Sequence, residues 1–141
     1  MSLKKRIQNP SIMKINEDYI LIVDDSQTNN VLLEAVLAEE DYPTQTAMSA
    51  TEAWNLIYKQ QPALILLDLL MPKISGFHLL ERLKSKEIYG KIPVIIVSAL
   101  NDPDTIRVLK EMGADDFFTK PLNIQGLLKR VAQLYPRQEA V

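Results

Sequence analysis

The central segment of the chain, Leu64-Ile65-Leu66-Leu67-Asp68, is a continuous apolar run that ends in a carboxylate. Two further runs of strand length, 20–23 and 94–97, have the same apolar character. Strands that are apolar on both faces are typical of a parallel sheet covered by helices on both sides. Weaker strand candidates at 44–48 and 117–119 are expected at the edges of this sheet.

The segments between these strands carry helix signals. Ser49, with Glu52 three residues later, forms a capping box, and Asp102 followed by Pro103 is typical of a helix start. Gly113 is expected to end the helix that begins at Pro103. Other helices are predicted from about residue 28, over 76–83, and over 124–134 after a cap at position 123. Five strand–helix alternations predict an α/β fold, a three-layer α/β/α sandwich around a parallel sheet.

Length and composition favour a single domain. The chain has 141 residues, a net charge of -2, no cysteine and no apolar run near the roughly 20 residues that span a bilayer. We therefore expect a cytoplasmic protein with no membrane segment and no direct nucleic-acid binding. The domain is expected over 17–135, between an N-terminal extension over 1–16, part of it a cloning remnant, and a tail over 136–141.

Chemically useful side chains stand where the predicted strands end. Asp24 and Asp25 follow the first strand, Asp68 the third, Ser98 the fourth and Lys120 the last. In an open parallel sheet these ends lie on one edge, where ligands bind. An Asp after a strand is, taken alone, more often a cap or turn residue. Four strand ends on one edge, each with a chemically useful side chain, indicate a site.

Three neighbouring carboxylates repel one another, and Lys120 offsets only one charge. Such a cluster either raises the proton affinity of a carboxylate or recruits a hard divalent cation, and Mg²⁺ suits few carboxylates with several waters. Asp68 could then attack phosphorus and form an acyl phosphate. Ser98 and Lys120 would contact the phosphoryl oxygens.

These residues lie in motifs that resemble the receiver-domain family of two-component response regulators. The matching stretches are 20–25 (Ile-Leu-Ile-Val-Asp-Asp), 68–76 (Asp-Leu-Leu-Met-Pro-Lys-Ile-Ser-Gly), 97–99 (Val-Ser-Ala) and 113–121 (Gly-Ala-Asp-Asp-Phe-Phe-Thr-Lys-Pro), within a resemblance that covers 18–135. The resemblance implies a flavodoxin-like, five-stranded sheet of order 2-1-3-4-5. It also implies phosphorelay signal transduction, with Mg²⁺ or Mn²⁺ as cofactor and a sensor histidine kinase or phosphotransfer protein as donor.

The resemblance assigns a role to each matching residue. Asp68 matches the phosphoacceptor, Asp24 and Asp25 match the acidic metal pair, and the main-chain carbonyl of Leu70 matches the third protein ligand of the metal. A receiver of this type is a signalling domain that assists its own phosphorylation and dephosphorylation, and it is not an enzyme acting on a free substrate.

The switch residues are carried over in the same way. Ser98 matches the hydroxyl that turns toward the phosphoryl group, and Lys120 the lysine that pairs with it, before a peptide bond to Pro121 that is usually cis. Phe117 stands at the aromatic switch position, where tyrosine is commoner. The resemblance places the output surface on the helix over 103–112, the last strand and the last helix.

A few positions depart from the family pattern or qualify it. Ser75 stands where Asp or Asn is common, and it is expected to cap the following helix. The resemblance implies that Leu70 and Leu100 flank the path of an attacking water, and because neither side chain can orient water we expect slow self-dephosphorylation. His78, the only histidine, lacks the context of a phosphotransfer histidine and is expected at the surface.

Three alternatives fit less well. A haloacid dehalogenase phosphatase needs an acid two residues after its nucleophile on the first strand, whereas Asp24 and Asp25 are adjacent. A nucleotide-binding module needs clustered glycines, and all four glycines here are isolated. A receiver that has lost phosphorylation would lack acidic or switch residues, yet all are present. The output stays open: an unknown downstream protein, an output domain missing from this chain, or a phosphorylation-dependent homodimer.

Overall fold

The computed structural model describes residues 18–136, which form one five-stranded parallel sheet with strand order β2-β1-β3-β4-β5. The strands are β1 (Ile20–Val23), β2 (Thr44–Ala47), β3 (Leu64–Leu67), β4 (Val94–Ser98) and β5 (Asp116–Thr119). β1, β3 and β4 are buried throughout, whereas the edge strands β2 and β5 are partly exposed. The predicted fold class, strand order and edges are confirmed.

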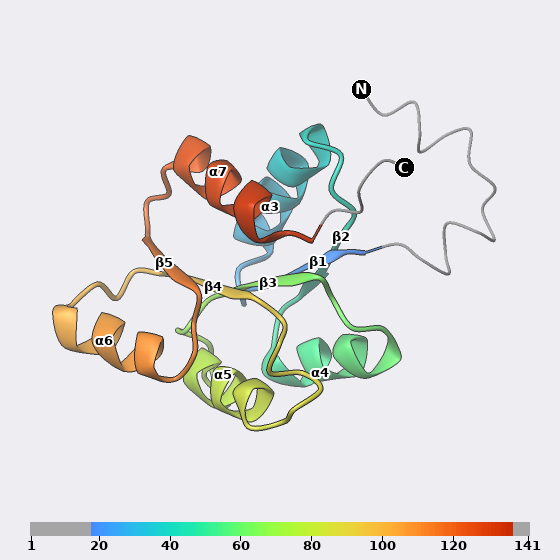
Figure 1. Cartoon of the computed structure of the whole chain (residues 1–141). Coiled ribbons are helices and arrows are strands. Elements are labelled where there is room, and N and C mark those ends of the chain that lie inside the picture. Colours follow the sequence, from blue (N-terminus) through green and yellow to red (C-terminus); the bar gives the residue numbers. More distant parts are fainter. Residues whose placement is uncertain (1–17, 137–141) are drawn as a thin grey trace.

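Helices cover both faces of the sheet. They are α3 (Gln27–Glu39), α4 (Ala50–Lys59), α5 (Gly76–Lys84), α6 (Pro103–Glu111) and α7 (Ile124–Leu134). In Figure 1, α3 and α7 lie above the sheet, and α4, α5 and α6 lie below it. Successive strand residues point to opposite faces of the sheet. Ile20 and Ile22 therefore join the core between the sheet and helices α3 and α7, whereas Leu21 joins the core between the sheet and helices α4 and α5.

Most of the predicted helix ends are confirmed. Asp102 accepts a hydrogen bond from the N–H of Thr105, Asn123 caps α7, and Gly113 has a φ of 106° just beyond α6. Ser49 Oγ accepts from the N–H of Glu52 at 3.1 Å. The other half of the capping box differs, because the Glu52 carboxylate accepts from the N–H of Met48 at 2.7 Å.

Two predicted helix starts need correction. Ser75 makes no capping hydrogen bond with its side chain, because its Oγ contacts Nδ1 of the exposed His78 at 3.2 Å. α3 starts at Gln27, one residue earlier than predicted, and is capped by Ser26, whose Oγ accepts from the N–H of Asn29. β2 also ends one residue earlier than predicted, and β5 begins one residue earlier.

The predicted extension over 1–16 lies outside the described residues, as does the predicted tail over 136–141 apart from its first residue. Among residues 18–136, none of the helices is long and apolar enough to cross a membrane.

Candidate functional site

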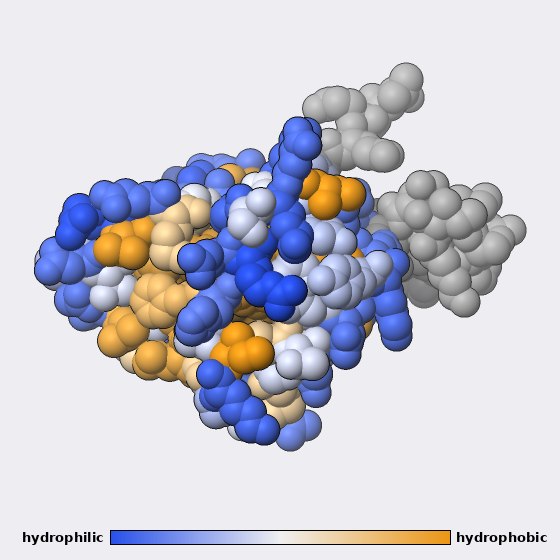
Figure 2. Space-filling view, turned by 90° about the horizontal axis from the view of Figure 1, so that it is seen from below, coloured by the Kyte–Doolittle hydropathy of each residue, from blue (hydrophilic) through white to orange (hydrophobic). Residues whose placement is uncertain are grey.

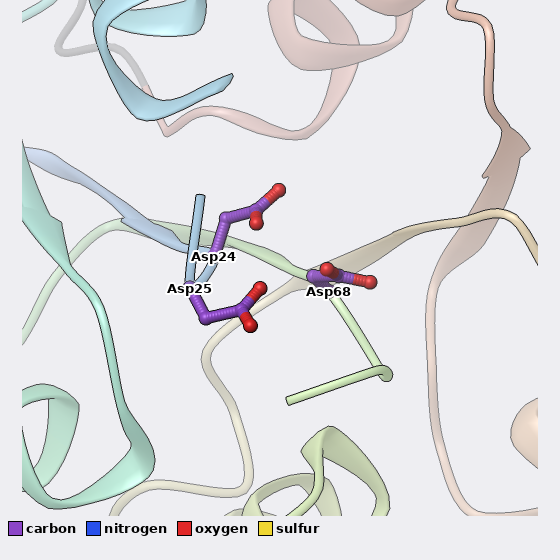
Figure 3. A group of neighbouring side chains, drawn as sticks. All are labelled: Asp24, Asp25 and Asp68. Atoms are coloured by element: carbon purple, nitrogen blue, oxygen red, sulfur yellow. The ribbon is translucent and has the colours of Figure 1, made fainter. Parts of the chain in front are cut away.

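Three carboxylates meet at the carboxyl ends of β1 and β3. One oxygen each of Asp24, Asp25 and Asp68 lies within 4.8 Å of the others, and Figure 3 shows the three side chains side by side at these strand ends. The Asp24 and Asp68 side chains are buried, whereas Asp25 is exposed. The group therefore consists of two buried carboxylates and one that is accessible to solvent.

The two buried carboxylates are held by specific donors. Asp24 Oδ1 accepts from the N–H of Ser26 at 2.9 Å, and its Oδ2 accepts from the side-chain amide of Asn29 at 3.3 Å. Asp68 Oδ1 accepts from the N–H of Leu70 at 3.2 Å. Lys120 Nζ lies 3.1 Å from Asp24 Oδ2 and 3.5 Å from Asp68 Oδ2, so it bridges the pair.

The pKa values reflect this crowding. Burial raises the pKa of the Asp68 carboxyl, and the charge of Asp24 adds to the rise, against the lowering effects of the Leu70 N–H and of Lys120. Burial alone would lower the pKa of Lys120, but its hydrogen bonds to the two carboxylates and their charges outweigh burial and raise it. The lysine is therefore charged, and it offsets one of three neighbouring carboxylates.

Ser98 and Phe117 lie on the two strands beyond Asp68. Ser98 is fully buried at the end of β4, and its Oγ accepts a hydrogen bond from the N–H of Leu100 at 3.2 Å. Phe117 on β5 is partly buried against the core below the sheet. The peptide bond between Lys120 and Pro121 is cis, as the resemblance implied.

A hollow of about 360 Å³ opens beside the acidic group. Asp24, Asn29 and Lys120 form its polar end, and its apolar wall comes from Leu32, Leu33, Val97, Pro121, Leu122 and Ile124. Neither the hollow nor the role of Asn29 was predicted. The available signal was the position of Asn29 in the first turn of the helix that directly follows the acidic pair.

A family model, the response regulator receiver domain, matches residues 20–132, which is most of the chain. The chain belongs to this family. The receiver domain is a signalling module in two-component phosphorelays, phosphorylated on an aspartate, and membership implies a histidine kinase or phosphotransfer partner. The phosphatase and nucleotide-binding alternatives are thereby excluded.

Individual relatives agree with this assignment. The response regulator PleD of Caulobacter vibrioides is 41% identical over 116 residues, which cover 82% of this chain and 25% of PleD. Sporulation initiation phosphotransferase F of Bacillus subtilis is 37% identical over 83% of this chain and 93% of its own length. The signal receiver domain of a signal transduction histidine kinase from Syntrophus aciditrophicus superimposes with a TM-score of 0.78, at 36% identity, over 88% of this chain and 96% of that chain.

This receiver domain spans only a quarter of PleD and about half of several other curated relatives. Its acidic group has the composition of a divalent metal site, since hard carboxylate oxygens are the ligands such cations prefer.

Proposed function

We propose that Asp68 accepts a phosphoryl group from a phosphohistidine of a sensor histidine kinase or a phosphotransfer protein. The observation that carries this proposal is the placement of a buried carboxylate, Asp68, between a lysine at 3.5 Å and the acidic pair Asp24 and Asp25. This chain would act in the cytoplasm, where the ATP that supplies the phosphoryl group of such a donor is found.

The acidic group fits a divalent cation. Three carboxylates and one ammonium leave an excess of negative charge in a mostly buried site, which a hard divalent ion would balance. Asp24, Asp25, Asp68 and the main-chain carbonyl of Leu70 would hold Mg²⁺ or Mn²⁺. When bound, the ion supplies positive charge that neutralises the phosphoryl oxygens during transfer.

The residues of this chain supply the nucleophile and its orientation. A carboxylate oxygen of Asp68 forms the new O–P bond while the P–N bond to the donor imidazole breaks, and the leaving imidazole takes up a proton. The Leu70 N–H holds the Asp68 carboxylate in place at 3.2 Å. Lys120 already lies beside Asp68 Oδ2 and would pair with a phosphoryl oxygen.

The signal would leave through α6, β5 and α7. Ser98 Oγ accepts from the N–H of Leu100, and we propose that the hydroxyl turns toward the phosphoryl group and moves the loop between β4 and α6 with it. Phe117 would follow by packing, since it has no hydroxyl. Figure 2 shows apolar surface gathered on the α6 side of the lower face. One of the exposed large apolar side chains, Val108, belongs to α6. This surface would bind a downstream protein, an attached output domain or a second copy.

Incubation with acetyl phosphate tests the proposal. We expect phosphorylation with Mg²⁺ or Mn²⁺ and almost none when a chelator removes the metal. Ser98→Ala should still be labelled, but its α6 and β5 amide NMR signals should shift less than those of the wild type. Equal labelling with and without the chelator would contradict the metal-assisted mechanism.

A further inference from the structure

Two consecutive asparagines in the first turn of α3 donate hydrogen bonds to Asp24. The Asn29 side-chain amide donates to Asp24 Oδ2 at 3.3 Å, and the Asn30 amide donates to the Asp24 main-chain oxygen at 2.9 Å. Asn30 is buried, and its amide also lies 3.5 Å from the Ala47 carbonyl at the end of β2. Asn30 thus fixes the main chain of Asp24, while Asn29 acts on its carboxylate.

The Asp24 carboxylate has three donors, and Asn29 is the neutral side chain among them. Oδ1 accepts from the Ser26 N–H, whereas Oδ2 is shared by Asn29 and Lys120. Lys120 is in turn shared between Asp24 at 3.1 Å and Asp68 at 3.5 Å. Without the amide of Asn29, Asp24 Oδ2 would depend on Lys120 alone. The lysine would then be drawn toward Asp24 and away from Asp68.

We propose that Asn29 is a positioning residue, which orients the Asp24 carboxylate toward the metal and leaves Lys120 available to Asp68. This inference rests on the function proposed above. Groups that orient metal-binding side chains typically change metal affinity by roughly 10- to 100-fold when removed. Loss of the Asn29 amide should therefore weaken metal binding rather than the fold.

Substitution at this position should leave the helix intact. Asn29 is half-buried in the first turn of α3, and its main-chain N–H, which bonds to Ser26 Oγ, is retained in any substitution except proline. Leucine and alanine are better helix formers than asparagine. A purely structural effect of Asn29→Leu should therefore leave the thermal unfolding temperature unchanged or raise it.

The test is Mn²⁺ binding to the unphosphorylated protein, measured by electron paramagnetic resonance. Wild type, Asn29→Leu and Asn29→Ala are compared with Thr28→Ala, an exposed neighbour in the same turn. We expect both Asn29 variants to bind Mn²⁺ about 10-fold or more weakly, with Thr28→Ala and the unfolding temperatures unchanged. The Mg²⁺ concentration for half-maximal phosphorylation should rise by the same factor, while the rate at saturating Mg²⁺ changes less.

The possible outcomes separate this inference from the proposed function. If the wild type binds no Mn²⁺, the proposal of a metal site is itself contradicted. If the wild type binds and both Asn29 variants bind equally well, the positioning role is overturned while the metal site stands. Weaker binding that appears only together with a lower unfolding temperature would also overturn it, because the effect would then come from the fold.

Discussion

At the scale of single residues, repulsion among the carboxylates of the site destabilises the folded protein. Asp68 and Asp24 are both buried, and the negative charge of Asp24 disfavours the ionised form of Asp68. Lys120 lies between them but cannot balance both, and Asp25 adds a third carboxylate. Sites built for chemistry commonly carry such a cost, which a bound ligand then offsets.

Neutralising the acceptor should therefore stabilise the metal-free protein. We expect Asp68→Asn to raise the free energy of unfolding by about 0.5 to 2 kcal/mol in a chelating buffer, measured by urea unfolding. Asp104→Asn, at an exposed position paired with Arg107, should change it by less than about 0.5 kcal/mol. A destabilised Asp68→Asn protein would show that repulsion among the carboxylates is already balanced.

The lifetime of the phosphorylated state should depend on Leu70. Its side chain is about half exposed, and because it is apolar it cannot orient a water. We expect Leu70→Asn to speed loss of the phosphoryl group by roughly tenfold, less than the hundredfold or more of a true general base. The decay is followed by intact-mass measurement. Leu70→Ala separates the loss of apolar cover from the gain of an amide, and unchanged decay in Leu70→Asn would contradict this role.

The site residues were predictable to different degrees. Asp24, Asp25, Asp68 and Lys120 could be brought together from sequence because parallel strands place their carboxyl ends on one edge. The hydrogen bonds of Asn29 could not, because asparagine in the first turn of a helix is common and its partner depends on side-chain geometry.

At the scale of elements, the start of α5 lies against the segment that directly follows β3 and carries Asp68. The Gly76 N–H donates to the Leu69 carbonyl at 3.0 Å. A Cβ at position 76 would collide with the main-chain oxygen of Asp68 and lie 2.7 Å from the Leu69 Cα. Only glycine permits this close approach between the start of α5 and the main chain after β3.

Gly76→Ala should therefore displace α5 or Asp68. We expect it to lower the free energy of unfolding by about 1 to 3 kcal/mol despite the better helix propensity of alanine, and to slow phosphorylation. Ser75→Ala is the matched control. Because Ser75 makes no capping bond, this change should cost less than the roughly 1 kcal/mol typical of a lost cap. Urea unfolding of both variants checks this, and equal costs would contradict it.

Caps were predictable where the local sequence alone decides them. Asp102 and Asn123 bond to an N–H three residues later, which is a local pattern. The predicted cap at Ser75 was wrong because its hydroxyl contacts the His78 ring one turn away. The cap at Ser26 was missed because the acidic residues beside it indicated a site rather than a helix start.

At the scale of the whole molecule, tyrosine side chains join segments that are far apart in the sequence. The Tyr19 hydroxyl, just before β1, donates to the Gln60 carbonyl at the end of α4 at 2.6 Å. At the same end of the sheet, the Tyr135 hydroxyl donates to the Asp18 carbonyl, and its ring lies 4.8 Å from that of Tyr42. The order of the strands followed from apolar runs and the family resemblance, but these long-range contacts could not be predicted from any local pattern.

Tyr19 makes the free energy of unfolding fall at alkaline pH. Burial raises the pKa of Tyr19 to about 12, from about 10 in the unfolded chain. Between these values the unfolded state loses a proton that the folded state keeps, so stability is fully present below pH 10 and falls as pH rises toward 12. We expect wild type to lose about 2 kcal/mol more than Tyr19→Phe across this range in urea unfolding. Parallel losses would contradict a buried, protonated Tyr19.

The central claim is that Asp68 is the acceptor. Intact-mass measurement after incubation with acetyl phosphate and Mg²⁺, on wild type and Asp68→Ala in parallel, tests it most directly. The structure predicts that the wild type gains the mass of one phosphoryl group and that Asp68→Ala gains none. Equal labelling of the two proteins would contradict the assignment.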